Sequence, residues 1–227
     1  MERRIPVRQA SLNVAKLVRL RKDAELAKSL QDCELVTIDG QGIAIGLRMF
    51  GISNADRIAG IDLFMALLSH CADAGRRPYI LGTKQEVLDQ ALAKAVAQFP
   101  GLEFAGSHHG YFPAEHEEEI ASHITQSGAD CLFVAISSPA KERFIARHAD
   151  RMDVPFIMGV GGSVDVLAGK TNRAPGWMQR FGMEWFFRLM QEPRRMFWRY
   201  ASTNTAYALL LAKALLSGDN PVKRVPE

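Results

Sequence analysis

Residues 131–135 read Cys-Leu-Phe-Val-Ala, a short, uninterrupted apolar run between two helical patterns at 115–126 and 140–150. Such a run is typical of a strand buried on both faces, because a half-exposed strand alternates polar and apolar residues. Further strands are predicted at 35–38, 78–81, 102–105 and 155–158, and further helices at 42–50, 62–74 and 84–99. Strands that alternate with helices predict an α/β fold whose parallel sheet is covered by helices on both faces.

The pattern changes after Gly169, where two helices are predicted at 175–187 and 193–216 with no further strand. From residue 166 onward the chain has ten Lys and Arg against four Asp and Glu, and it has all three tryptophans. A basic surface with amphipathic aromatics favours an anionic ligand or an anionic membrane face, with a solvated basic helix as the alternative. We therefore divide the chain into a catalytic core, 1–170, and a helical basic appendage, 171–227, whose apolar residues 207–216 are expected to rest on a bilayer.

Composition excludes several classes of protein. The chain is 48% hydrophobic and 23% charged, as expected of a globular protein with a real core. Cys33, Cys71 and Cys131 lie in apolar contexts without CxxC spacing, which indicates buried packing and a reducing cytosol. No signal-peptide pattern is expected at the N-terminus, and the longest apolar stretch, 206–216, is too short to span a membrane.

Short catalytic motifs are missing from the sequence. It has no GxGxxG, GxxxxGK[ST], GxSxG or HExxH pattern, and no DxD pair to hold a divalent metal against a diphosphate. His108, His109 and His116 are interpreted as packing residues, because adjacent histidines rarely bind one ion. Glycines do follow several predicted strands, and ligands of open parallel sheets bind at the carboxyl ends of strands.

A set of ordered segments is far more specific. The most distinctive are VGGSVDVLAGKTNRAP at 160–175 and MEWFFRLMQEPRR at 183–195. Others are Asp39-Gly40, Arg57-x-x-Gly60-x-Asp62-Leu63, Gly106-x-x-His109-Gly110-Tyr111-Phe112 and Ser138-Pro139-x-x-Glu142. From about residue 8 to 200 the chain resembles the WecG/TagA/CpsF family of bacterial glycosyltransferases, which act in common antigen, teichoic acid and capsular or exopolysaccharide synthesis. The resemblance implies a Rossmann-like core and a C-terminal appendage that completes the active site.

The resemblance also implies the reaction. It is an inverting transfer from a UDP-sugar donor to a polyprenyl-diphosphate-linked saccharide, performed by a UDP-sugar-dependent hexosyltransferase without metal or cofactor. The implied location is the cytoplasm, peripheral on the inner face of the cell membrane, with an anionic membrane surface as partner. No nucleic-acid motif accompanies the basic charge, so no nucleic-acid partner is expected. A homo-oligomer is left open.

The implied catalytic residues are Asp39 and Arg195. An inverting transfer needs one base to deprotonate the acceptor hydroxyl, and Asp39 follows the predicted strand 35–38 directly. Asp62 and Asp165 are rival carboxylates, and Arg194 is an alternative to Arg195. Arginine neutralises a leaving diphosphate well, because its guanidinium binds phosphate oxygens in a bidentate way. The positions implied to bind substrates are Ser11, Asn13, Arg57, Lys141, Gly161, Gly162, Arg188 and Arg199.

Two positions depart from the family's pattern. Ser11 stands where members often have threonine, and Lys141 stands where they have glutamine. A lysine changes both charge and hydrogen bonding, which points to a different donor sugar, with an acidic sugar favoured. An alternative function is a non-catalytic subunit that binds a nucleotide sugar in the same pathway.

Overall fold

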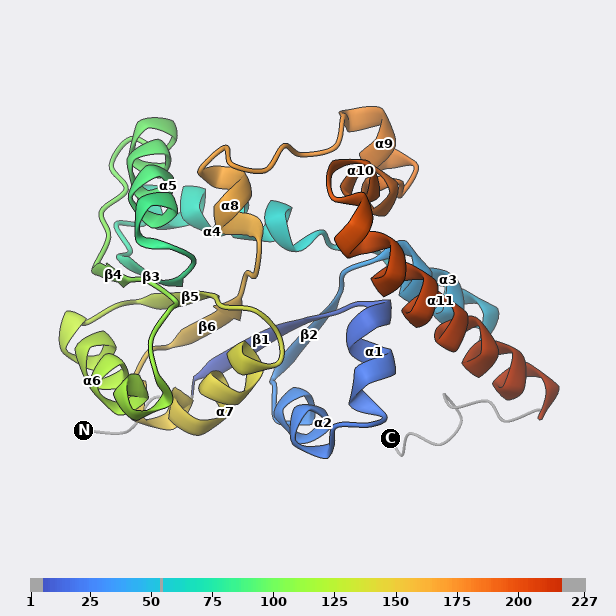
Figure 1. The fold of residues 1–227 in the computed structure, drawn as a ribbon. Helices are drawn as coiled ribbons and strands as arrows, with labels where there is room; N and C mark the ends of the chain where they lie inside the picture. The colour runs from blue at the N-terminus through green and yellow to red at the C-terminus, as the bar shows by residue number, and fades with distance from the viewer. Residues whose placement is uncertain (1–5, 54, 218–227) are drawn as a thin grey trace. The chain divides into compact units, whose positions relative to one another are not determined.

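Six strands form one sheet, in the order β2-β1-β6-β5-β3-β4, in a computed structural model that describes residues 6–53 and 55–217 (Figure 1). The strands are β1 (Val7–Leu12), β2 (Leu35–Ile38), β3 (Pro78–Gly82), β4 (Gly106–His108), β5 (Cys131–Ala135) and β6 (Phe156–Gly159). The pairs β1–β6, β6–β5, β5–β3 and β3–β4 are all parallel. The predicted α/β fold with a Rossmann-like parallel sheet is confirmed.

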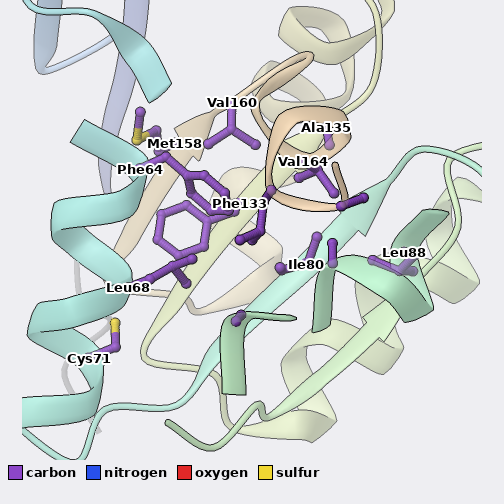
Figure 2. Close-up of a cluster of buried hydrophobic side chains, with 14 of the residues drawn as sticks. Phe64, Leu68, Cys71, Ile80, Leu88, Phe133, Ala135, Met158, Val160 and Val164 are labelled. Atoms are coloured by element: carbon purple, nitrogen blue, oxygen red, sulfur yellow. The ribbon is translucent and has the colours of Figure 1, made fainter. Parts of the chain in front are cut away.

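One face of the central strands packs against α4 (Gly60–Asp73), α5 (Gln85–Gln98) and α8 (Ser163–Leu167). Successive side chains of a strand point to opposite faces, so Ile80, Phe133 and Met158 all lie on this side (Figure 2). Phe64 of α4 meets Phe133 edge to face, with ring centroids 5.0 Å apart. This layer is wholly apolar, as expected for a strand run without polar alternation.

The opposite face packs against α6 (Glu117–Ser127) and α7 (Ala140–Met152), with the short 3-10 helix η1 (Ala114–His116) before α6. Leu81, Val134 and Ile157 supply this side, each one residue along from a residue of the first face. The helix α2 (Ala24–Gln31) contacts α7 through an ion pair of 2.9 Å between Glu25 and Arg143. Both faces of the sheet are therefore covered.

The chain divides by its contacts into two compact units. Unit 1 comprises residues 1–11, 25–36 and 60–172 and contains most of the sheet. Unit 2 comprises residues 12–24, 37–59 and 173–227. Its helices are α1 (Val14–Leu20), α3 (Gln41–Met49), α9 (Gly176–Arg180), α10 (Glu184–Gln191) and α11 (Pro193–Leu216). The C-terminal helices thus share one unit with two segments from the start of the chain, because α11 packs against α1 and α10.

Several elements differ from their predictions. The segment 102–105, predicted as a strand, is not one: Leu102 is buried in the core from a loop, and the residues that pair with β3 begin at Gly106. The single helix predicted at 175–187 is also wrong, because Gly182 adopts a left-handed φ of +69° and separates α9 from α10. The strand β1 was not predicted, since half of its sequence VRQASL is polar and it forms no continuous apolar run.

No membrane-spanning helix was expected, and the three cysteines were expected to be buried. Among the described residues, every helix is too short or too polar to cross a bilayer. Cys71 and Cys131 are buried, as predicted, and their sulfur atoms lie 3.6 Å apart, whereas Cys33 is only partly buried.

Candidate functional site

Three chain segments meet in unit 2 where β1 and β2 end. The backbone N–H of Asp39 donates to the carbonyl of Leu12 at 2.8 Å. The N–H of Ile58 donates to the carbonyl of Ile38 at 2.9 Å. These two bonds bring together the positions of Asn13, Asp39 and Arg57, three residues that the sequence analysis assigned to the site.

The turn after β2 places Asp39 beside Asn13. Gly40 has a φ of +140°, a backbone conformation that residues other than glycine rarely adopt. A Cβ built on Gly40 would lie 3.7 Å from Cβ of Asn13. Asn13 is the N-cap of α1, and its Oδ1 accepts a hydrogen bond of 2.9 Å from the N–H of Lys16. The amide oxygen of Asn13 is therefore occupied by the cap, which leaves its NH₂ group as the part that can serve a substrate.

Arg57 is held by a carboxylate from the far end of the chain. Its Nη2 donates to Oε2 of Glu184, the first residue of α10, at 2.8 Å. Nη2 of Arg173 lies 3.8 Å from the other oxygen, Oε1, of the same carboxylate. Arg188 stands one helical turn beyond Glu184 and is exposed. Arg57 and Arg173 therefore place two positive charges beside one negative charge, with the exposed Arg188 one turn further along α10, an arrangement suited to an anionic ligand.

The other two arginines assigned to the site lie on α11. Arg199 is exposed, and its backbone carbonyl accepts a hydrogen bond from the hydroxyl of Thr203 at 2.7 Å. Arg195 belongs to the first turn of α11, and its side chain lies outside the described part of the structure. The assigned roles of Arg188, Arg195 and Arg199 remain predictions.

A second group of assigned residues meets in unit 1, where β5 and β6 end. Lys141, in the first turn of α7, is only 9% exposed. Its alkyl chain lies so close to Gly159 that a Cβ there would be 2.7 Å from Lys141 Cε. Gly161 has a φ of +51°, and a Cβ there would lie 3.8 Å from the Lys141 ammonium. That ammonium also lies 3.7 Å from Oε1 of the buried Glu142.

Gly162 and Ser11 occupy neighbouring strand ends. Gly162 precedes the short helix α8, and no other group would lie within 4 Å of a Cβ built on it. Ser11 stands near the end of β1, and its hydroxyl accepts a hydrogen bond of 3.3 Å from Gln9 Nε2. Both residues thus lie at the carboxyl edge of the sheet, where ligands of such folds bind.

A third cluster, at the end of β3, was not predicted. Thr83 has a left-handed φ of +54°, unusual for a residue with a branched side chain, and its hydroxyl donates to Oδ1 of Asp165 at 3.2 Å. Lys170 Nζ reaches the same oxygen at 3.2 Å. Asp165 is thus engaged in holding the loop after β6, while Asp62 lies exposed in the first turn of α4. Within residues 6–53 and 55–217, no three His, Cys, Asp or Glu side chains are grouped to hold a metal ion.

Glu184 and Arg173 were also missed as site residues. Both lie in the distinctive segments of the sequence, but no spacing rule links them to Arg57, which is 127 residues from Glu184. Only covariation of the two positions among related sequences would have shown this pairing.

Known proteins resemble this chain over most of its length. Residues 1–221 match the family described as the glycosyl transferase WecG/TagA/CpsF family. A protein of Bacillus subtilis (strain 168), named N-acetylglucosaminyldiphosphoundecaprenol N-acetyl-beta-D-mannosaminyltransferase, is 31% identical over 192 residues, which cover 85% of this chain and 73% of that protein. A protein of the same name in Bacillus spizizenii (strain ATCC 23059 / NRRL B-14472 / W23) is 32% identical over 184 residues, covering 81% of this chain and 70% of that protein. Because the family match runs through both units of the structure, this chain belongs to the WecG/TagA/CpsF family of glycosyl transferases.

Proposed function

We propose that this protein transfers a hexose, with inversion, from a UDP-sugar donor to a saccharide linked to polyprenyl diphosphate, in the synthesis of a bacterial surface polysaccharide. The observation that carries the proposal is the convergence of Asp39, Asn13 and Arg57 at the ends of β1 and β2. The names of the two Bacillus relatives support the acceptor class, since both describe a diphosphoundecaprenol-linked N-acetylglucosamine.

Asp39 is proposed as the base. Its carboxylate takes the proton of the acceptor hydroxyl as the hydroxyl oxygen attacks the anomeric carbon of the donor. The bond from that carbon to the UDP oxygen breaks at the same time, and UDP leaves with the electron pair. The NH₂ group of the neighbouring Asn13 is proposed to hold the acceptor. A positioned base accelerates such a step by about 10²–10⁴.

The charge of the leaving diphosphate is proposed to be balanced by arginine. Arg57 pairs with Glu184 in unit 2, Arg188 lies on the same helix as Glu184, and Arg195 and Arg199 follow on α11. Guanidinium groups bind phosphate oxygens through paired, charge-assisted hydrogen bonds. In unit 1 the donor is proposed to meet Ser11, Lys141, Gly161 and Gly162 at the carboxyl edge of the sheet.

Metal independence is proposed on the same grounds, because arginines supply the positive charge that a divalent metal would otherwise give. Saturating EDTA is expected to leave the initial rate of UDP release unchanged. A rate that collapses in EDTA and returns with magnesium or manganese would contradict this proposal.

An anionic bilayer is the proposed partner of unit 2. Large side chains of unit 2 are strongly exposed, among them Trp177, Phe181, Trp198 and Leu216. Tyr207, which was expected to face the bilayer, is instead buried and donates a hydrogen bond to the carbonyl of Gly42 at 3.0 Å. The surface proposed to meet lipid therefore excludes the side of α11 that packs against α3.

The test measures UDP release by the full chain with a short-chain polyprenyl-diphosphate N-acetylglucosamine acceptor. The donor panel contains UDP-hexoses, UDP-N-acetylhexosamines and UDP-uronic acids. The uronic acids are included because Lys141 favours an acidic sugar. Acceptor-dependent turnover with one donor class is the expected result. Tight donor binding without turnover of any donor would favour the alternative, a non-catalytic subunit that binds a nucleotide sugar.

A further inference from the structure

Glu184 joins two arginines that come from different parts of unit 2. Its Oε2 accepts a hydrogen bond of 2.8 Å from Arg57 Nη2, and its Oε1 lies 3.8 Å from Arg173 Nη2. The side chain of Glu184 is 22% exposed and that of Arg57 is 15% exposed. Oε1 is buried and makes no hydrogen bond to any of the described residues, so its interaction with Arg173 is one of charge alone. The pair with Arg57 is thus only partly exposed, so its charges are screened by water less than those of a fully exposed pair.

Arg57 needs such a partner because its own backbone gives it little support. It lies in the non-helical stretch before α4, and the next residue, Ile58, is bonded to the strand end that precedes Asp39. A free arginine side chain loses about 2 kcal/mol of rotamer entropy when it is fixed by a ligand. A carboxylate that fixes the guanidinium beforehand removes most of that cost at the moment of binding.

We propose that Glu184 is a positioning residue, which holds Arg57 and Arg173 in the orientation that binds a diphosphate group of a substrate. The inference rests on the proposed function and deepens it. Two arginines, Arg57 and Arg173, face the single carboxylate of Glu184, so this group keeps a surplus of positive charge for an anion. The exposed Arg188 follows one turn later on α10. Both substrates carry a diphosphate, one in the UDP-sugar and one in the polyprenyl acceptor.

The first experiment replaces Glu184 with Gln, which keeps the shape and removes the charge. Misplacement of a substrate-binding group by about 1 Å costs up to about a hundredfold in rate, so kcat/KM of E184Q is expected to fall roughly tenfold to a hundredfold. The melting temperature should change little, since partly exposed ion pairs add little stability. E184D keeps the charge on a shorter side chain, and its kcat/KM should lie between those of E184Q and the wild type. E184D therefore replaces E184Q as the test variant if E184Q does not fold.

The matched control is Asp56→Asn. Asp56 is next to Arg57 in sequence, is exposed, and pairs only weakly with Arg48 at 3.8 Å. D56N removes the same charge as E184Q without touching the Arg57 guanidinium, so its kcat/KM should stay at the wild-type value. If D56N and E184Q lost kcat/KM equally, the effect would come from removing a negative charge anywhere in this region, and the proposal would be overturned.

A second experiment separates positioning from a structural role. In R57A, added guanidinium ions at non-denaturing concentration are expected to restore part of the activity, because the Glu184 carboxylate remains to bind them. The double variant R57A/E184Q should show no such rescue. In addition, E184Q should lower the activity of R57A much less than that of the wild type, since residues that act together are not additive. Equal rescue in both backgrounds, or fully additive losses, would show that Glu184 does not act through Arg57.

Separate titrations decide which diphosphate is bound. A rise in KM for the UDP-sugar alone assigns the arginines to the donor, and a rise for the polyprenyl acceptor alone assigns them to the acceptor. Calorimetric binding of UDP and of the acceptor analogue to E184Q and wild type keeps the test independent of turnover. If the wild type transfers no sugar, the proposed function fails, whereas unchanged binding of both diphosphates by E184Q would defeat the present inference.

Discussion

At the scale of single residues, Asp39 is positioned through its backbone. Its N–H is bonded to Leu12, and Gly40 then turns the chain so that the two residues after β2 lie against Asn13. Replacing the side chain of Asp39 should therefore leave the turn in place, because none of these contacts involves its carboxylate. The backbone contacts that set the turn can therefore be kept while the side chain is changed in a mutational test.

Asp39→Asn is expected to keep the fold and to lose activity by about 10²–10⁴, because an amide cannot accept the acceptor's proton. Initial rates of UDP release, with circular dichroism as the check on folding, would measure this. Asp62→Asn is the matched control, since Asp62 is the rival carboxylate and lies exposed on α4. Near-normal turnover by D39N together with a dead D62N would move the base to Asp62.

Three residues of the candidate site were implied by the family resemblance, but the ion-pair partner of Arg57 could not be predicted from the sequence. Asp39, Asn13 and Arg57 were named from the sequence, and backbone hydrogen bonds bring their segments together. Their ion-pair partner Glu184 is remote in sequence, so neither periodicity nor motif spacing carried information about it. Contacts between remote segments depend on tertiary packing, which local patterns do not encode.

At the scale of elements, two glycines let α11 approach α3 closely. Gly42 and Gly46 lie one turn apart on α3, and Tyr207 of α11 rests over them. The Tyr207 hydroxyl donates to the Gly42 carbonyl at 3.0 Å, and burial raises the pKa of this phenol, so it stays a neutral donor. A larger residue on this face of α3 would push the two helices apart.

Gly46→Ala is therefore expected to destabilise the protein by about 1–3 kcal/mol, the usual cost of overpacking. The added Cβ would collide with the Tyr207 hydroxyl, and Leu211 Cδ2 would lie 3.2 Å from it. Urea unfolding of G46A and of G176A would be compared, because a Cβ on Gly176 meets no other group within 4 Å. Equal stability of the two variants would mean that α3 and α11 do not pack as described.

Glu34 ties the beginning of β2 to β1 and gives unit 1 a dependence on pH. A hydrogen bond from the Arg8 side chain lowers the pKa of Glu34 from 4.5 to about 2. The stabilisation is thus fully present above pH 4.5 and is lost as pH falls towards 2. Because the Glu34 side chain is 34% exposed, we expect only about 1 kcal/mol from the pair.

Glu34→Gln should accordingly unfold at lower urea concentration than the wild type at pH 7, and the difference should shrink steadily below pH 4.5. Paired urea titrations at pH 7 and pH 3 measure it. A difference that stays constant, or grows, as the pH falls would show that the Arg8–Glu34 contact does not form.

Prediction of the elements was accurate where burial produced a simple pattern. The strands at 35–38 and 131–135 and the helix at 193–216 were predicted with the bounds that the structure has. In contrast, β1 was missed because it mixes buried residues such as Ala10 with polar ones such as Gln9, which is itself buried. The segment 102–105 was wrongly predicted as a strand because its apolar residues Leu102 and Phe104 pack in the core from a loop, and buried strands contain the same residue types.

At the scale of the whole molecule, charge and exposed aromatics are concentrated towards the C-terminus. Trp198 is 74% exposed and Phe181 is 75% exposed, and both lie among exposed arginines. Amphipathic aromatics anchor proteins at the interface of a bilayer, and each basic residue near an anionic surface adds about 1 kcal/mol of attraction. This combination underlies the proposed membrane contact.

Trp198→Ala and Phe181→Ala are each expected to weaken sedimentation with phosphatidylserine-containing vesicles, and added salt should weaken it further. Tyr111→Ala is the matched control, because Tyr111 is 69% exposed but belongs to unit 1. Vesicle binding that is insensitive to both substitutions, or equally sensitive to Y111A, would place the membrane contact elsewhere.

The composition of unit 2 also has a consequence for synthesis on the ribosome. Residues 12–24 and 37–59 emerge early, whereas their partner α11 emerges only after the whole of 60–172 has been translated. At about 5–20 residues per second, translation of this segment takes about 6–23 seconds. During that time α1 and α3 have no C-terminal helix to cover them, and the half-made chain exposes apolar surface that chaperones recognise. The proposed base, Asp39, is made among the first residues, but the unit that contains it is completed among the last.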